Sequence, residues 1–254
     1  MTKNTLISAA CLLAGLPSLL AAAPSENDPP TSPVAPVYND RHWVPARYAK
    51  VKQNMANLPC DVFFIGDSIT EQWEIVGKKV WDEKFVPLKA VNFGVSGDRT
   101  EHILWRMEDT KLATTTPPKV CVLMVGTNNI GTWKGEQTPK ETVEGVKKIV
   151  TTLLDKFPST HVIILETTPY GPDPKGNLRI LGEKVNAEIR KLKLPRTNIV
   201  NYNKYFLNPD KTFKPGLFKD HVHLTEQGYR VWCEHLLPEV EKWLKKSDQA
   251  SPRS

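Results

Sequence analysis

Residues 61–73 read DVFFIGDSITEQW. The first six are nearly all apolar and end at a glycine, which is typical of a parallel strand covered on both faces. Ser68 follows at once, just before the polar start of a helix. A serine at such a turn lies at the carboxyl edge of a sheet, beside the free N–H groups of a helix start. The stretch favours an α/β fold with Ser68 as candidate nucleophile, although a helix cap formed by Asp67 or Ser68 explains the same letters.

Four further apolar runs resemble this first strand. They read KAVNFG, KVCVLMVG, HVIILET and NIVNY, at residues 89–94, 119–126, 161–167 and 198–202. Amphipathic helical patterns lie between and after them, at residues 100–108, 139–157, 178–192 and 225–245. This alternation predicts a parallel sheet with helices on both faces, and a site at the carboxyl ends of its strands.

The bulk composition fits one ordinary globular domain. The chain has 254 residues, of which 40% are hydrophobic and 24% charged, enough for one sizeable core. The formal net charge of +6 bears on solubility and names no ligand. No basic run interleaved with aromatic residues indicates a nucleic-acid surface, so we expect no nucleic-acid partner.

The N-terminus has the layout of a secretory signal peptide. A single Lys3 precedes an apolar stretch from Leu6 to Leu20 and then small residues, which predicts a signal peptide over 1–23, with cleavage as late as residue 25. Gly15 and Pro17 interrupt an apolar run that is too short to span a bilayer. We therefore expect a secreted or periplasmic protein without stable membrane insertion after removal of this segment. The residues before Cys11 fit a lipobox poorly, which disfavours a lipid anchor.

The remaining chain divides into three parts. Residues 24–37 are rich in proline, serine and acidic side chains, which predicts a flexible linker. The catalytic domain is expected over 38–246, and residues 247–254 are expected to form a disordered tail. Three cysteines remain after export, and buried free thiols are the favoured interpretation of Cys60, Cys121 and Cys233.

The second and third predicted strands also end in residues that suit a catalytic site. The loop NFGVSGDRT follows the second strand, and the backbone N–H of its Gly97 could face a developing oxyanion. The third strand runs into GTNN, where the Asn128 side-chain amide could donate to the same oxygen, although asparagine is also a common turn residue. Arg99, Glu101 and His102 are interpreted as a solvated helix start, the alternative being contact with a polar substrate.

The motif DHVHLT, at residues 220–225, precedes the last predicted helix. Asp220 lies three residues before His223 and can contact its Nδ1, which leaves Nε2 free to take the Ser68 proton. A metal site using His221 and His223, and a loop in which Thr225 caps the helix, are the alternatives. No companion cluster supplies further metal ligands, so we expect no metal.

Taken together, these blocks resemble the SGNH, or GDSL-like, hydrolase family. Its four letters correspond to Ser68, Gly97, Asn128 and His223. The resemblance is closer still to bacterial relatives of the platelet-activating-factor acetylhydrolase catalytic subunits, through NFGVSGDRTEHILWRM, GTNN and DHVHLTEQGY, and covers roughly residues 40–245. It implies a flavodoxin-like, three-layer α/β/α fold with a five-stranded parallel sheet.

The resemblance also implies roles for individual residues. Ser68 would attack an ester carbonyl, His223 would transfer the proton and Asp220 would orient the imidazole, with no cofactor needed. The N–H groups of Ser68 and Gly97 and the amide of Asn128 would form the oxyanion hole. Four further residues are candidates for substrate binding: Asp67, Asn129, Trp133 and His221. His221 stands where close relatives often have an aromatic residue.

The primary functional hypothesis is an exported serine esterase acting on short acyl esters, above all acetyl groups on carbohydrates. An esterase or lysophospholipase directed at lipids, with activity like that of the platelet-activating-factor acetylhydrolases, is the alternative. A third hypothesis, from another class, is a glycan-binding module that keeps the fold without the chemistry. Fold analogy supports the reaction class and does not identify the substrate.

Overall fold

The computed structural model describes residues 32–131 and 137–250, with the side chain of the last residue left aside. A five-stranded, wholly parallel sheet forms its centre, with the strand order β2-β1-β3-β4-β5. The strands are β1 (Val62–Gly66), β2 (Ala90–Asn92), β3 (Val120–Met124), β4 (His161–Leu165) and β5 (Thr197–Val200). This is the flavodoxin-like order, so the predicted fold class is confirmed.

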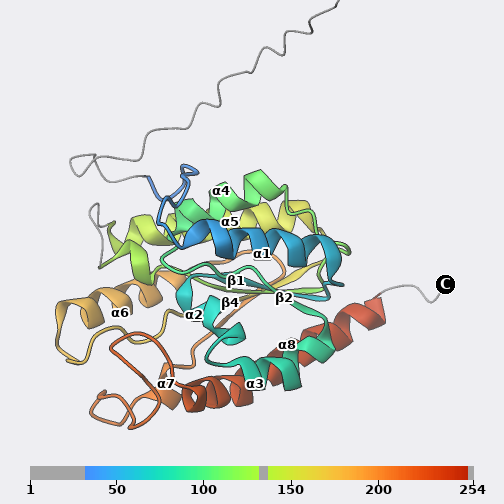
Figure 1. The fold of residues 1–254 in the computed structure, drawn as a ribbon. Helices are drawn as coiled ribbons and strands as arrows, with labels where there is room; N and C mark the ends of the chain where they lie inside the picture. Colours follow the sequence, from blue (N-terminus) through green and yellow to red (C-terminus); the bar gives the residue numbers. More distant parts are fainter. Residues whose placement is uncertain (1–31, 132–136, 251–254) are drawn as a thin grey trace, which may run out of the picture.

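Helices cover both faces of the sheet, as Figure 1 shows. One layer contains α1 (Val44–Asn57), α4 (Thr100–Thr110), α5 (Pro139–Lys156) and α6 (Asn177–Ile189). The other contains α7 (Asn203–Phe206), α8 (Glu226–Ala250) and the short turns α2 (Ser68–Glu71), η1 (Gln72–Glu74), α3 (Lys78–Val80), η2 (Trp81–Phe85) and η3 (Val86–Leu88), while η4 (Thr127–Asn129) follows β3. Within the described residues, no helix is long and apolar enough to cross a membrane.

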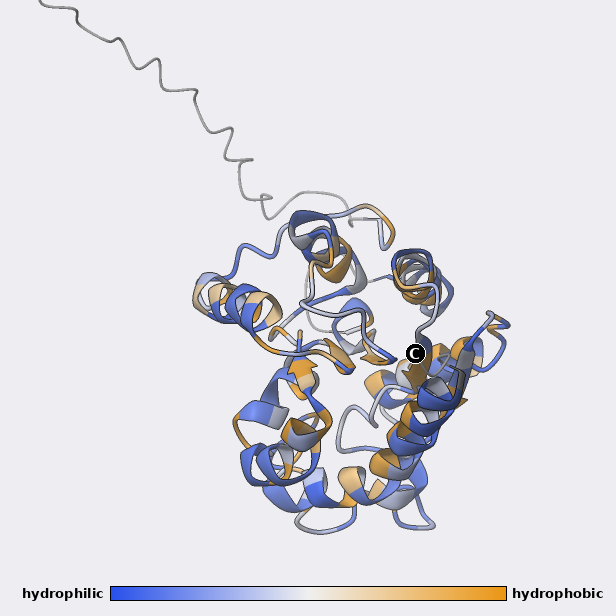
Figure 2. Cartoon of the chain, turned by 90° about the vertical axis from the view of Figure 1, so that its right-hand side faces the viewer, coloured by the Kyte–Doolittle hydropathy of each residue, from blue (hydrophilic) through white to orange (hydrophobic). Residues whose placement is uncertain are grey.

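The two hydrophobic cores follow from the two-residue period of the strands. In β1, Phe63 and Ile65 face the layer of α1, α4, α5 and α6, whereas Val62 and Phe64 face the layer of α8. Because both faces are covered, β1 to β4 are buried along their whole length. In Figure 2 the orange strands lie between helices whose outer surfaces are largely blue. The edge strand β5 is only partly buried, but its Ile199 packs against one core and its Val200 against the other.

Local signals explain where the helices begin. The side chain of Thr138 accepts a hydrogen bond from the Glu141 amide, and the Glu141 carboxylate accepts one from the Thr138 amide, which forms a capping box at the start of α5. Pro139 takes the first helical position, where its missing N–H costs nothing. Sequence reasoning missed α1, although its buried Val44, Val51 and Met55 have helical spacing.

Both predicted boundaries of the domain need correction. Residues 32–37, the end of the predicted linker, are attached to α4: the Pro33 carbonyl accepts the Thr100 hydroxyl (3.0 Å), and the Val37 N–H donates to the Glu101 carbonyl (3.2 Å). At the other end, α8 continues to Ala250, four residues into the predicted tail. No helix-breaking residue occurs there before Pro252. The predicted signal peptide and the first part of the linker lie outside the described residues.

All three described cysteines are free and buried, as expected.

Candidate active site

The residues that follow β1, β2 and β3 lie together at the carboxyl edge of the sheet. Ser68 follows β1, the loop with Ser96 and Gly97 follows β2, and Asn128 follows β3. Together with the loop before α8 they surround a cavity of about 310 Å³, at the lower end of the range of about 300–1,000 Å³ usual for ligand pockets. The cavity is lined by Trp43, Asp67, Ser68, Ile69, Gln72, Ser96, Gly97, Thr127, Asn128, Tyr170, Val222 and His223.

Ser68 is the first residue of α2 and is held there by its two predecessors. The Asp67 carboxylate accepts the Ile69 N–H at 3.0 Å and so caps the helix. Gly66 ends β1 where no larger residue fits, because a Cβ would lie 2.1 Å from the Thr70 hydroxyl and 2.4 Å from the Met124 carbonyl oxygen. The predicted strand-to-helix turn therefore presents Ser68 at the sheet edge.

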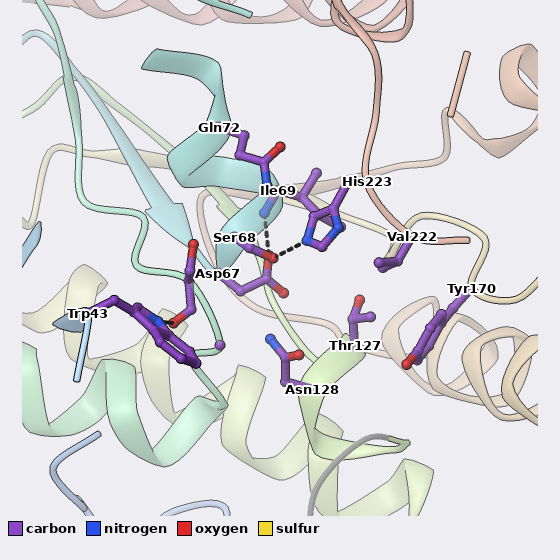
Figure 3. Close-up of a pocket in the computed structure, with 12 residues that line it drawn as sticks. Trp43, Asp67, Ser68, Ile69, Gln72, Thr127, Asn128, Tyr170, Val222 and His223 are labelled. Atoms are coloured by element: carbon purple, nitrogen blue, oxygen red, sulfur yellow. Dashed lines mark hydrogen bonds between the residues drawn. The ribbon is translucent and has the colours of Figure 1, made fainter. Parts of the chain in front are cut away.

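His223 lies between Ser68 and Asp220. Its Nε2 is 2.9 Å from Ser68 Oγ, and its Nδ1 is 2.9 Å from Asp220 Oδ2 (Figure 3 shows the first of these contacts). The second oxygen of Asp220 accepts the backbone N–H groups of Val222 (2.8 Å) and His223 (2.7 Å), which fixes the loop. The structure thus brings together the three residues predicted as nucleophile, base and orienting carboxylate.

The carboxyl group of Asp220 is tuned by two opposing effects. Partial burial raises its pKa, but the hydrogen bonds from the His223 and Val222 amides and from the His223 ring together outweigh burial. The net pKa of Asp220 is lower than usual, so its carboxylate is ionised at neutral pH. An ionised carboxylate at Nδ1 favours the tautomer that leaves Nε2 as the proton acceptor.

The residues predicted for the oxyanion hole border the same cavity. Gly97 has a φ of +80°, a left-handed conformation that favours glycine. The Nδ2 of Asn128 donates to the Asp98 carbonyl at 3.0 Å, which orients the amide and leaves its second N–H for another acceptor. Figure 3 shows the Asn128 side chain directed toward Ser68. The site therefore combines a serine, an imidazole and candidate hydrogen-bond donors.

The prediction of substrate contact needs correction for Asn129, whereas for His221 it stays a prediction. Asn129 is fully buried and bonds to protein groups around the start of α4 and to Gln137, because the turn η4 directs it away from the cavity. His221 is exposed and does not line the cavity, whereas its neighbour Val222 does. Trp133 lies outside the described residues.

Asp67 does border the cavity, but it is only 1% exposed and its Oδ1 caps α2. Its Oδ2 has no hydrogen-bond partner among the described residues. Burial raises the pKa of Asp67 to about 7. A structural role at the helix start accounts for these contacts.

The segment 99–102 was predicted as a solvated helix start, and that prediction was wrong. Glu101 is fully buried and forms a 2.8 Å ion pair with the buried Arg99. His102 Nδ1 accepts the Arg99 N–H. Burial and then the nearby arginines lower the pKa of His102 to about 3, so the ring is neutral. Charged residues are usually exposed, so the sequence predicted a solvated segment. The partners that allow these side chains to be buried could not be identified from the sequence around them.

Two aromatic residues of the cavity wall were not identified as site residues. Trp43 precedes α1, and Tyr170 lies in the loop that follows β4. Figure 3 shows them on opposite sides of Ser68 and Asn128. In the structure Trp43 is 39% exposed, which is unusual for an indole.

Comparison with known proteins agrees with this geometry. The sequence model of the GDSL-like Lipase/Acylhydrolase family matches residues 64–231. The chain belongs to this family. As an acylhydrolase-family member it is a carboxylic ester hydrolase, which confirms the resemblance and the predicted reaction class.

The similarity to named relatives extends over most of the chain. The platelet-activating factor acetylhydrolase IB subunit alpha1 of Homo sapiens is 33% identical over 207 residues, covering 81% of this chain and 85% of the human protein. Solved family members have the same fold. A GDSL-like lipase from Bacteroides thetaiotaomicron superposes with a TM-score of 0.64 at 23% identity, covering 78% of this chain and 97% of that one. Axe2, an acetylxylan esterase from Geobacillus stearothermophilus, has a TM-score of 0.56 at 16% identity, covering 73% and 94%.

Proposed function

We propose that this hydrolase is a serine esterase that removes short acyl groups, above all acetyl, and that Ser68, His223 and Asp220 form its catalytic triad. The observation that supports the proposal is the chain of contacts between these three side chains at the cavity. Ser68 Oγ is 2.9 Å from His223 Nε2, and His223 Nδ1 is 2.9 Å from Asp220 Oδ2. Each contact is within the range expected of a nucleophile, its base and the group that orients the base.

The reaction then proceeds in two halves. Ser68 Oγ attacks the ester carbonyl carbon while His223 Nε2 takes the hydroxyl proton, and the carbonyl oxygen becomes an oxyanion. The N–H groups of Ser68 and Gly97 and the Asn128 amide would stabilise that charge. Collapse of the intermediate breaks the ester bond, and His223 returns the proton to the leaving alcohol. Water repeats the sequence on the acyl-enzyme and releases the acid.

The cavity supports a short acyl chain. It is small, and Ile69 and Val222, the sequence neighbours of the nucleophile and the base, both line it. A long acyl chain would need a larger apolar channel, whereas an acetyl group needs none. The relatives that share a third of the sequence are named as acetylhydrolases, which agrees with this assignment.

We further propose that the alcohol part of the ester is a carbohydrate. Trp43 and Tyr170 provide aromatic surface on two sides of the cavity, and aromatic rings with a polar edge suit partners that are part apolar and part polar. Two solved structures with this fold are named as acetyl xylan esterases. A lipid alcohol is the second candidate, and the names of the relatives at 33% identity favour it.

Hydrolysis of p-nitrophenyl acetate, butyrate and octanoate by the mature protein and by Ser68→Ala tests the reaction. We expect turnover that prefers acetate and is lost in the variant. Equal or absent turnover in both proteins would remove Ser68 from the mechanism and favour the glycan-binding hypothesis. A preference for octanoate would favour a lipid esterase with long-chain substrates.

Acetate release from acetylated xylooligosaccharides and from an acetylated glycerophospholipid, compared at equal concentrations, tests the alcohol. We expect the higher kcat/KM on the carbohydrate. Export is a separate proposal. N-terminal sequencing of the protein recovered outside the cytoplasm should find a start at residues 24–26, and a start at residue 1 would refute it.

A further inference from the structure

Side chains bind the backbone of Ser96 and Gly97 on both sides of the peptide group that joins them, and one of them binds the carbonyl of that group. Glu71 Oε2 accepts both the N–H and the hydroxyl of Ser96, each at 2.6 Å. The Ser96 carbonyl accepts the indole N–H of Trp43 at 3.0 Å. The next carbonyl, that of Gly97, accepts the Arg41 guanidinium at 2.9 Å. This loop carries the Gly97 N–H that the proposed function assigns to the oxyanion hole.

The loop has the marks of a type II turn. The Asp98 N–H donates to the Val95 carbonyl at 3.2 Å, which closes a four-residue turn, and its third residue, Gly97, has a φ of +80°. Type I and type II turns differ in the direction of their central peptide group. Here that group consists of the Ser96 carbonyl and the Gly97 N–H.

We propose that Trp43 is a positioning residue for catalysis: its indole N–H holds the Ser96 carbonyl and so directs the Gly97 N–H toward the oxyanion. In a trans peptide the carbonyl and the N–H point in opposite directions. A partner that fixes the carbonyl therefore fixes the N–H as well. This inference rests on the proposed function, because it needs Gly97 as an oxyanion donor.

Glycine at position 97 makes such a partner necessary. Glycine adopts positive and negative φ about equally well, so the turn itself sets only a small preference for the type II form. In the type I form the Gly97 N–H would point away from the oxyanion. The Trp43 contact favours the productive form, and by polarising the peptide group it also strengthens the N–H as a donor.

The position of Trp43 suits this role. It is the N-cap residue of α1, its ring contacts His42 with 4.8 Å between ring centroids, and the Arg41 guanidinium lies 6.0 Å from the ring centroid. These neighbours lie beside the indole, whose N–H is directed at the Ser96 carbonyl. The ring also lines the cavity, so a simple contact with substrate is the competing role.

Trp43→Phe separates the two roles, because it removes the N–H and keeps an aromatic wall. The matched control is Trp243→Phe. Trp243 lies in α8, and its ring stacks on that of His161 in β4. The Trp243 Nε1 has no hydrogen-bond partner among the described residues. With p-nitrophenyl acetate we expect kcat of Trp43→Phe to fall about tenfold, less than the roughly 10²–10³ lost with a whole oxyanion donor. KM should stay within about twofold, and the control should match the wild type.

A transition-state analogue provides the second readout. A trifluoromethyl ketone forms a hemiketal with Ser68 whose oxyanion occupies the same hole, so its inhibition constant should rise by the factor by which kcat/KM falls. Unchanged kcat in Trp43→Phe, or a rise in KM alone, would overturn the inference in favour of a wall role. If Trp43→Phe does not fold, benzothienylalanine at position 43 replaces the N–H with sulfur at nearly constant shape, and the same criteria apply.

The outcome also distinguishes this inference from the proposed function. Full activity of Trp43→Phe beside an inactive Ser68→Ala would refute the positioning role and leave the serine esterase intact. A wild-type protein without ester turnover would overturn both.

Discussion

Replacing Asn128 and Asn129 by alanine, one at a time, should separate catalysis from stability at two adjacent, chemically identical positions. Among the residues that the structure describes, the Asn128 side chain makes one hydrogen bond, to the Asp98 carbonyl, and it borders the cavity. If its second N–H stabilises the oxyanion, Asn128→Ala should lose about 10²–10³ in kcat, or roughly 2.7–4 kcal/mol of transition-state stabilisation. Unfolding free energy should fall by only about 1 kcal/mol, the usual net value of one hydrogen bond.

Asn129→Ala should behave in the opposite way. Its side chain accepts the Thr100 N–H and donates to the Thr100 hydroxyl (3.0 Å), to Glu101 (3.2 Å) and to Gln137 (2.7 Å), all in a fully buried environment. Several buried polar groups would lose a partner at about 1–3 kcal/mol each, so we expect a loss of roughly 3–5 kcal/mol in unfolding free energy. The fraction that remains folded should keep kcat within about tenfold.

Urea unfolding followed by tryptophan fluorescence, and p-nitrophenyl acetate kinetics at 25 °C, measure the two quantities on the same preparations. The reasoning is refuted if Asn128→Ala retains kcat within about threefold of the wild type. It is refuted equally if a stably folded Asn129→Ala loses as much kcat as Asn128→Ala, because the buried network would then act on the reaction.

Three further predictions concern titratable groups. Because the pKa of Asp220 is lowered, its carboxylate should stay ionised at neutral pH and keep the His223 ring oriented, so Asp220→Asn should lose about 10³–10⁴ in kcat. A variant that keeps kcat within about tenfold of the wild type would contradict this. Asp67 has a raised pKa of about 7, so its carboxyl group in the folded state keeps a proton that the unfolded state loses near pH 4. The unfolding free energy of the wild type relative to Asp67→Asn should therefore fall by up to about 1.4 kcal/mol per pH unit between pH 4 and 7 and then level off. A difference in urea unfolding that does not depend on pH would contradict this prediction. Burial raises the pKa values of the thiols of Cys60, Cys121 and Cys233. Iodoacetamide at pH 8 should therefore label none of them in the folded mature protein and all of them in denaturant. Rapid labelling without denaturant would show that the thiols are accessible.

The sheet could be predicted because its signals are local. Each strand is a short apolar run bounded by turn residues; four of the five predicted runs contain a strand of the structure, and the fifth overlaps β5, which begins one residue earlier. The reacting groups were visible for a related reason, since Ser68 directly follows a strand, and Asp220 and His223 are three residues apart in one loop. The family resemblance then gave an order to blocks that were ambiguous one by one.

The roles of the remaining site residues depend on side-chain directions that cannot be predicted from the sequence. Asn128 and Asn129 differ only in where the turn η4 directs them, one to the cavity and one into a buried network. Asp67 lies next to Ser68, yet the helix start takes its Oδ1 inward. Trp43 is 53 residues from its partner Ser96, and no periodicity connects positions so far apart.

This difference has a physical reason. The nucleophile and base are side chains, so their identity can be read from a sequence once their strand or loop is found. The oxyanion hole consists partly of backbone N–H groups, which every residue except proline possesses, and what distinguishes a useful one is its direction. Direction depends on distant partners, here Glu71 and Trp43 around the Ser96 peptide group. For this chain, the segment before the first strand therefore deserves the same mutational scrutiny as the motifs that carry the nucleophile and the base.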